Sequence, residues 1–180
     1  KEKSIQENEI DKIQTLLDKL DFRYGSSEVS LISLDGVYYT NKIRDHFVSD
    51  IASRFSKVSI IRSYLLNQQR NIAMASKCVM EGRDIGTVIF PNAYMKIFLT
   101  ASDEVRAIRR VLQLEEKGEQ VDLKQVLADI KERDSRDSSR KLAPLLQAED
   151  AIKIVTDNLD INQILDKLID IEAKQREKLG

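Results

Sequence analysis

Alternation between apolar runs and helical repeats in the second half of the chain is the feature that most constrains its fold. The segments between and after the apolar runs have helical spacing, and the runs themselves are residues 77–80, 95–99 and 151–155. Strands that alternate with helices favour a parallel sheet covered by helices, so we expect an α/β fold. Ser102 is expected to cap a helix that runs through Leu114. Further helices are expected over residues 123–140 and 161–174.

The first half of the chain follows a different pattern. Apolar residues at helical spacing predict a helix within residues 8–20. The short alternating runs that follow are residues 22–24, 29–34 and 37–39. Asp35-Gly36 lies between the last two runs and is a strong hairpin signal, so we expect a small antiparallel meander. A long helical segment at 47–74 is expected to break near residues 56–59. The meander lies outside the strand–helix alternation, as an insertion would.

Composition and charge narrow the class of protein. The 180 residues suit one domain, or one domain with an insertion, and 42% hydrophobic residues rule out a wholly disordered chain. No apolar run approaches ~20 residues, so no membrane span is expected. The single Cys78 fits a reducing compartment, and together with the single His46 it cannot build a zinc cluster. A net charge of −1 argues against a nucleic-acid coat, so we expect a cytoplasmic protein with neither membrane nor nucleic-acid partners.

Arginines gather on one face of each of two neighbouring expected helices. One face carries Arg133, Arg136, Asp137 and Arg140, and the preceding helix carries Arg106, Arg109 and Arg110. Guanidinium groups are planar, bidentate and always charged, so two such faces could close over a polyanion. The alternative is a pair of solvated helices whose arginines pair with nearby carboxylates, and composition alone favours it.

A short charged turn, Glu81-Gly82-Arg83-Asp84, directly follows the first apolar run. Ligands of parallel α/β sheets bind outside the carboxyl ends of the strands, so this turn is a candidate site. Arg83 could hold a phosphate, and Asp84 could accept from an exocyclic amine. The alternative is a strand-end turn with a local ion pair. Cys78 and Met80 are expected to be buried strand residues.

Several segments in register resemble the bacterial cytidylate kinase (CMP/dCMP kinase) family. They are residues 79–91, 96–102, 106–110, 132–140 and 143–145. Motifs that keep their order and spacing are far more specific than any one alone. The resemblance implies a P-loop NTPase-type parallel sheet flanked by helices. It also implies a helix within residues 1–20, an antiparallel NMP-binding insertion at about 21–45, and a kinase core over 46–180 with a mobile lid at about 106–140.

The resemblance also implies an activity and an acceptor site. The family transfers the γ-phosphoryl group of ATP to CMP or dCMP, with Mg²⁺, which gives CDP or dCDP and ADP. By matching position, Ser53, Arg62 and Asp84 would contact the cytosine ring, although Ser53 and Arg62 alone would be an ordinary cap and an ordinary surface arginine. Arg83 would hold the CMP phosphate, and Asp137 would reach the ribose and phosphate side. These nucleotides would be the partners of a monomer.

The remaining matched residues would act in phosphoryl transfer. Arg133 would work with Asp137 on the ribose and phosphate side, Arg110 would meet the ATP phosphates from the lid, and Arg140 would join the transfer site. No residue is assigned to a metal ion. If these roles hold, the arginine faces are a clamp and the solvated alternative is wrong.

The chain departs from the family pattern at its beginning. The family begins with a strand and a Gly-rich phosphate loop, but no Gly-x-x-x-x-Gly-Lys-[Ser/Thr] occurs within residues 1–180. Three explanations are open: an omitted part of a longer protein, which we favour; completion by another chain; or an inactive nucleotide-binding remnant or scaffold. A second departure at residues 155–157 leaves the adenine-side loop unassigned. Outside the family, an unrelated α/β interaction domain with solvated charged helices is the remaining alternative.

Overall fold

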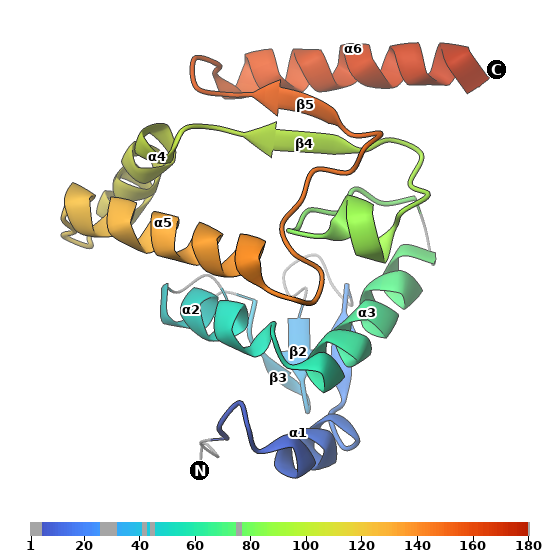
Figure 1. The fold of residues 1–180 in the computed structure, drawn as a ribbon, viewed down its shortest axis with the longest axis vertical. Coiled ribbons are helices and arrows are strands. Elements are labelled where there is room, and N and C mark those ends of the chain that lie inside the picture. Colours follow the sequence, from blue (N-terminus) through green and yellow to red (C-terminus); the bar gives the residue numbers. More distant parts are fainter. Residues whose placement is uncertain (1–4, 26–31, 41–42, 44–45, 75–76, 180) are drawn as a thin grey trace. The chain divides into compact units, whose positions relative to one another are not determined.

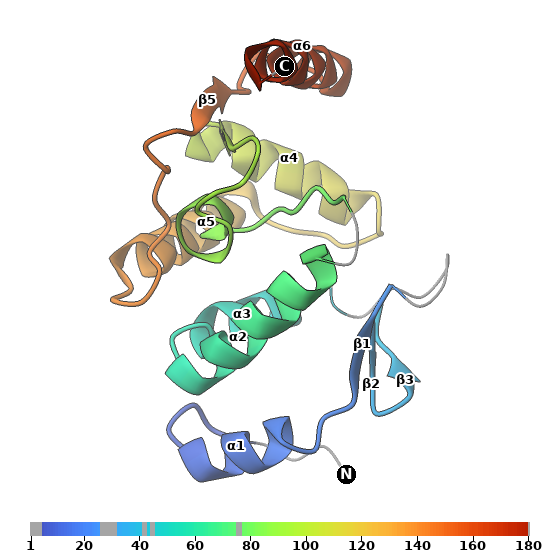
Figure 2. The same cartoon turned by 90° about the vertical axis from the view of Figure 1, so that its right-hand side faces the viewer.

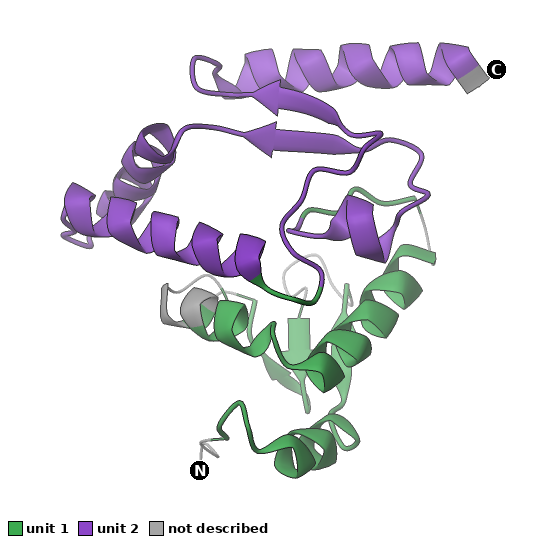
Figure 3. Ribbon diagram, in the orientation of Figure 1, with its two compact units in different colours: residues 1–81, 140–142 green, residues 82–139, 143–180 purple. Residues whose placement is uncertain are grey.

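The protein consists of two compact units in the computed structural model, which describes residues 5–25, 32–40, 43, 46–74 and 77–179. The first unit contains residues 1–81 and 140–142, and the second contains residues 82–139 and 143–180 (Figure 3). The predicted functional segments, with boundaries near residues 20 and 45, stay a prediction.

An antiparallel sheet of three short strands lies in the first unit (Figure 1). Its order is β1 (Phe22–Tyr24), β2 (Ile32–Leu34) and β3 (Val37–Tyr38). Phe22 pairs with Leu34 in the first ladder, and Leu34 pairs with Val37 in the second. This arrangement confirms the predicted meander. Residues 29–31 of the second predicted strand lie outside the described residues.

The turn between β2 and β3 has the geometry that its sequence predicts. Asp35, with φ 50°, and Gly36, with φ 76°, both lie in the left-handed region. Two such residues are typical of a type I′ turn, whose twist matches the twist of the flanking strands. Glycine enters this region without a steric penalty, and aspartate visits it more readily than most residues. The turn therefore fixes the register of the β2–β3 pair.

Three helices belong to the same unit. They are α1 (Ile10–Leu17), α2 (His46–Phe55) and α3 (Ser59–Met74). α1 packs against α3, as Figure 2 shows, and Ile13 of α1 is only 3% exposed. The predicted break lies between α2 and α3, where the Ser56 hydroxyl donates to the carbonyl of Ser53 at 2.6 Å. A hydroxyl that bonds to the local backbone competes with the helical ladder, so it favours the end of α2 here.

A parallel pair of strands forms the sheet of the second unit. β4 (Ile97–Thr100) pairs with β5 (Ile152–Val155), and Ile97 lies opposite Ile152. Parallel neighbours need a long crossover, which here contains two helices. The finding confirms the α/β class that the alternation of apolar runs and helices predicts.

The crossover is a hairpin of two helices, α4 (Asp103–Glu115) and α5 (Leu123–Ser139). α4 begins as predicted, because the Ser102 hydroxyl accepts from the backbone N–H of Val105 at 3.4 Å. Small and branched side chains fill the space between the helices, namely Ala107, Leu114 and Val126, with Val111, Val121, Leu127 and Ile130 packed against them. This core holds the two arginine-bearing helices side by side (Figure 1).

The last helix, α6 (Ile161–Leu179), is longer than the sequence predicts. Asp160 caps its start. The Asp160 carboxylate accepts from the N–H of Gln163 at 2.8 Å, and the Gln163 side chain accepts from the N–H of Asp160 at 3.0 Å. No helix in the described part of the chain is long and apolar enough to cross a membrane.

One predicted strand is wrong. Residues 77–81 have no regular secondary structure, Cys78 is exposed, and Val79 is fully exposed. Met80 is only half-buried. The apolar run fits a strand locally, but a strand forms only where a neighbour completes its hydrogen-bond ladder. Among the described residues, the parallel sheet contains β4 and β5 alone, and neither pairs with this segment.

Candidate functional site

The turn that bears Arg83 and Asp84 leads into one turn of wide helix, η2 (Ile85–Ile89). The carbonyl of Asp84 accepts from the N–H groups of Val88 at 2.9 Å and Ile89 at 3.2 Å. Asp84 itself is 8% exposed. A Cβ at Gly82 would lie 2.9 Å from the side chain of Ile85, so a larger residue here would displace that side chain. Short helical turns of this kind are frequent at functional sites.

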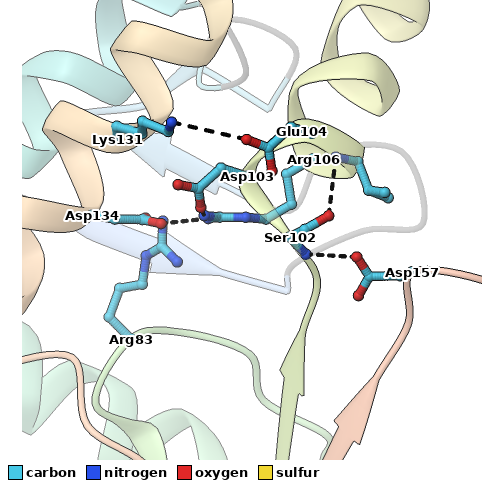
Figure 4. A network of polar contacts seen from close by, with 9 residues as sticks. Arg83, Ser102, Asp103, Glu104, Arg106, Lys131, Asp134 and Asp157 are labelled. Carbon is cyan, nitrogen blue, oxygen red and sulfur yellow. Dashed lines mark hydrogen bonds and ion pairs between the residues drawn. The ribbon is translucent and has the colours of Figure 1, made fainter.

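Two carboxylates, from Asp134 (Figure 4) and from Asp137, hold the guanidinium group of Arg83. Its Nε lies 3.1 Å from Oδ2 of Asp137, and its Nη2 lies 3.7 Å from Oδ1 of Asp134. Asp137 is 3% exposed, so the closer of the two pairs is buried on one side. Both carboxylates come from the last two turns of α5, which ends at Ser139. Arg83 therefore does form an ion pair, as the alternative interpretation of this turn predicted. The pair is not local, because its partners lie on α5.

Arg133 completes the group around Asp137. Its Nε lies 3.9 Å from Oδ2 of Asp137, as expected for residues four apart on a helix. The same Nε is buried and donates no hydrogen bond. The pKa of Arg133 is lowered from its ordinary value, first by burial and then by repulsion from the Arg83 guanidinium. A buried donor therefore lacks an acceptor beside two neighbouring guanidinium groups, so an anion such as a phosphate fits this position.

Arg106 joins α4 to the same network. Its Nη1 lies 2.5 Å from Oδ2 of Asp134, and its Nη2 donates to Asp103 one turn earlier. Burial works against the charge of Arg106, but hydrogen bonds to Asp134 and Asp103 raise its pKa above the ordinary value. Lys131 and Glu104 form a looser pair across the two helices, at 3.9 Å. Asp134 is thus shared between an arginine of α4 and the turn that bears Arg83.

The neighbouring arginines of α4 differ sharply from each other. Arg109 donates to the Thr156 hydroxyl at 3.0 Å and to the Thr156 carbonyl at 2.6 Å, in the loop after β5. Arg110 forms no side-chain hydrogen bond or ion pair with any described residue. Asp157 of the same loop accepts from the N–H of Ser102 at 3.0 Å. Arg109 and Asp157 therefore connect this loop to α4 and to the residue that caps it.

The first unit brings together three predicted site residues around one serine. Ser56 donates to the carbonyl of Ser53, and its own carbonyl lies 3.4 Å from Nη1 of Arg62. Its hydroxyl accepts from Nη1 of Arg140 at 3.2 Å. Arg140 lies just past α5, which ends at Ser139, so the predicted helix is one residue too long. Ser53 is 7% exposed, which is more buried than an ordinary surface cap.

A profile of the cytidylate kinase family matches residues 1–174 of the chain. The chain belongs to the cytidylate kinase family. It is 46% identical over 172 residues to a cytidylate kinase of Caldicellulosiruptor saccharolyticus, an alignment that covers 95% of this chain and 76% of that protein. It is 40% identical over 171 residues to a cytidylate kinase of Stutzerimonas stutzeri. That alignment covers 93% of this chain and 74% of that protein.

The same match extends to fused proteins. A bifunctional pantoate ligase/cytidylate kinase of Prochlorococcus marinus is 42% identical over 171 residues, which covers 93% of this chain and 33% of that protein. The chain thus spans about three quarters of the two single enzymes and a third of the fused one. Membership of the family shows a kinase and confirms the resemblance that the motifs carry. Nothing favours the inactive remnant or the unrelated interaction domain.

The cytidylate kinase residues predicted from sequence are divided between the two units. Ser53, Arg62 and Arg140 lie in the first unit, and the second contains Arg83, Asp84, Arg110, Arg133 and Asp137. Inside each unit the structure brings most of them to one cluster. Their roles in binding and transfer stay predictions. No group of three or more metal-ligating side chains occurs among residues 5–25, 32–40, 43, 46–74 and 77–179.

Two residues at the centres of the clusters had no assigned role in the sequence. Ser56 lies at the expected helix break but carried no motif of its own. Asp134 belongs to the carboxylates near the arginines but carries no motif of its own. A signal for Asp134 does exist, since it lies three residues before Asp137 on the same helix, so the two side chains are neighbours on its surface. The packing of α4 on α5, which brings Arg106 to Asp134, is not visible in spacing.

Proposed function

We propose that the chain carries the acceptor site and the lid of an enzyme that transfers the γ-phosphoryl group of ATP to CMP or dCMP. The products are CDP or dCDP and ADP. The observation that supports this most is the family match over residues 1–174. Phosphoryl transfer of this kind depends mainly on positioning and on charge stabilisation, and arginine is the side chain best suited to both.

Arg83 and Arg133 would bind the acceptor phosphate. The closest contacts of the two carboxylates that hold Arg83 are to its Nε and Nη2, so its Nη1 would be the donor that faces the phosphate. Arg133 contributes a buried Nε without an acceptor. A phosphate would accept from both groups and would relieve the repulsion that lowers the pKa of Arg133. Asp137 would hold these two arginines in place and reach the ribose.

Asp84, Arg62 and Ser53 would read the base. Cytosine carries an exocyclic amine that donates, whereas uracil carries an acceptor at that position, so a carboxylate favours cytosine. Asp84 is 8% exposed, and Ser53 is 7% exposed. Burial makes a mismatched polar group costly, which suits residues that discriminate between two similar rings.

Arg110 would meet the phosphates of ATP, and Arg140 would donate to the group in transfer. The α4–α5 hairpin that bears Arg110 corresponds to the predicted lid, whose closure would exclude water from the reaction. Mg²⁺ would supply charge neutralisation on the ATP phosphates, which are its usual ligands in kinases.

The setting of the enzyme is part of the same proposal. The single Cys78 is exposed and free, which suits a reducing compartment such as the cytoplasm. We propose a monomer that acts on small nucleotides in pyrimidine nucleotide metabolism and has no nucleic-acid or membrane partner.

A coupled ADP-release assay with CMP, ATP and Mg²⁺ tests this function. The full-length gene product should form CDP, whereas residues 1–180 alone should not, since they lack the Gly-x-x-x-x-Gly-Lys-[Ser/Thr] loop. AMP and GMP as acceptors serve as controls. Absence of CMP-dependent turnover in a folded full-length protein would refute the proposal. Robust turnover by residues 1–180 would refute the need for the loop.

A further inference from the structure

The contacts of Asp134 point to a role that is distinct from that of its neighbours on α5. Its two oxygens face two different arginines: Oδ1 lies 3.7 Å from Nη2 of Arg83, and Oδ2 lies 2.5 Å from Nη1 of Arg106 (Figure 4). Its side chain is 24% exposed, so solvent screens these pairs only in part. Asp134 therefore joins the turn after residue 81 to both helices of the hairpin.

The two carboxylates that contact Arg83 lie along one edge of its guanidinium group. A guanidinium group has donors along its side edge, from Nε and Nη2, and at its far end, from Nη1 and Nη2. Asp137 lies at Nε and Asp134 at Nη2, so both carboxylates lie along the side edge. The closest contact of neither carboxylate is at Nη1, at the far end. A phosphate could therefore bind at the far end while both carboxylates stay in place.

We propose that Asp134 is a positioning residue, which orients Arg83 for the acceptor phosphate by anchoring its Nη2 to Arg106 of α4. This inference rests on the proposed function. Asp137 alone would hold one atom of a long, rotatable side chain, whereas two carboxylates fix the plane of the guanidinium group. Supporting residues of this kind matter because a binding group must be held close to its productive geometry.

The charge balance of the network fits this role. The guanidinium groups of Arg83, Arg106 and Arg133 share the two carboxylates of Asp134 and Asp137. A third carboxylate, from Asp103, pairs with Arg106 only. Removing Asp134 would leave Arg106 with Asp103 but would leave Arg83 with Asp137 alone. The repulsion between Arg83 and Arg133 would then turn Arg83 away from the phosphate position.

A double-mutant cycle in the full-length enzyme tests the inference. Asp134→Asn keeps the shape and removes the charge, and it should raise KM for CMP ~10-fold while kcat falls less. The inhibition constant of cytidine, which has no phosphate, should stay within about twofold of wild type. In an Arg83→Ala background, Asp134→Asn should change KM for CMP by less than about twofold, since its target is already gone.

Glu132→Gln is the matched control, because it removes one charge from an exposed position of the same helix. It should leave KM and kcat near the wild-type values. Thermal unfolding of each variant separates positioning from loss of fold. If Asp134→Asn does not fold, Asp134→Glu displaces the carboxylate by one methylene and should give a smaller rise in KM for CMP with cytidine binding unchanged.

The outcomes separate two failures. If the wild-type enzyme does not phosphorylate CMP, the proposed function is wrong. If it does, but Asp134→Asn matches Glu132→Gln, or its effect is undiminished in the Arg83→Ala background, then the function stands and the positioning role is wrong. A rise in the inhibition constant of cytidine equal to the rise in KM for CMP would also overturn it.

Discussion

The two units hold their candidate residues in different ways. In the first unit a neutral serine, Ser56, contacts Ser53, Arg62 and Arg140 through hydrogen bonds. In the second unit the carboxylates of Asp134 and Asp137 hold the arginines through ion pairs. A serine orients an arginine without changing the local charge, whereas a carboxylate orients it and also offsets its charge. The effects of substitutions at the two centres should therefore differ in their dependence on salt.

The largest expected effect tests whether the two units contribute equally to transfer. We predict that Arg133→Ala, in the second unit, and Arg140→Ala, in the first, each lower kcat by ~10²-fold or more. Charge that develops in the transition state gains most from such donors, so KM should change less. Steady-state kinetics of the full-length enzyme, with circular dichroism to check the fold, give the measurement.

Arg136→Ala is the control for this pair, because Arg136 shares α5 but has no matched family role. It forms a pair with exposed Glu132 at 3.9 Å. If Arg133→Ala and Arg140→Ala lower kcat no more than Arg136→Ala does, the arginine faces are solvated surfaces and do not clamp the phosphates. If only one of them lowers kcat, transfer depends on one unit alone.

A second, smaller effect concerns the choice of base. Asp84→Ala should lower kcat/KM for CMP and narrow the ratio of CMP to UMP efficiency by about tenfold, since a mismatched buried polar group costs ~1–3 kcal/mol. Competition between CMP and UMP in one reaction measures the ratio directly. Arg62→Ala, in the other unit, should narrow it as well if both units read the base. An unchanged ratio in a folded Asp84→Ala enzyme means that Asp84 does not read the base.

Local signals predicted the elements of the fold well. Asp35-Gly36 needs only its own backbone preference to form a turn, and Ser102 needs only the next three residues to cap α4. The segment at 77–81 shows the limit, because its apolar residues fit a strand but a strand depends on a neighbour far along the chain. Pairing partners are not encoded in the segment itself.

The candidate site divides along the same line. The spacing of Arg133 and Asp137 on one helix predicted that they would meet, and they lie 3.9 Å apart. The pairing of Arg106 with Asp134 depends on how α4 packs on α5, which spacing does not determine. Ser56 was predicted only as part of a helix break, because its contacts come from residues six and 84 positions away.

A third effect tests the serine centre of the first unit. Ser56→Ala removes the hydroxyl that accepts from Arg140, and the loss of one such hydrogen bond costs about 1 kcal/mol, or roughly fivefold in KM or kcat. Because the group is neutral, this change should be nearly independent of salt, whereas the effect of Asp134→Asn should shrink as salt rises. Ser63→Ala, at an exposed position of α3, is the control. Equal salt dependence of the two effects would remove the distinction between the units.

The smallest expected effect concerns acid stability of the second unit. Hydrogen bonds from Ser102, from its side chain and then its backbone, hold the pKa of Asp157 below its ordinary value of about 4. Lys96 similarly lowers the pKa of Asp150. A carboxyl whose pKa is lowered by folding stabilises the fold above the pKa of the unfolded chain, and this contribution is lost as pH falls through the folded pKa. The apparent Tm should therefore fall between about pH 5 and pH 3.

Asp157→Asn tests this source of acid sensitivity, because the amide cannot ionise and its contact with Ser102 no longer changes with pH. Thermal unfolding followed by circular dichroism should show a shallower fall in Tm for this variant than for wild type over the same pH range. The change should be small, since the carboxylate is exposed to solvent and screened by it. Asp166→Asn, at an exposed position of α6, is the matched control and should keep the wild-type slope. If both variants show the same slope, the Ser102–Asp157 contact does not contribute to acid sensitivity, and Asp150, whose pKa is lowered by Lys96, is the next carboxylate to substitute.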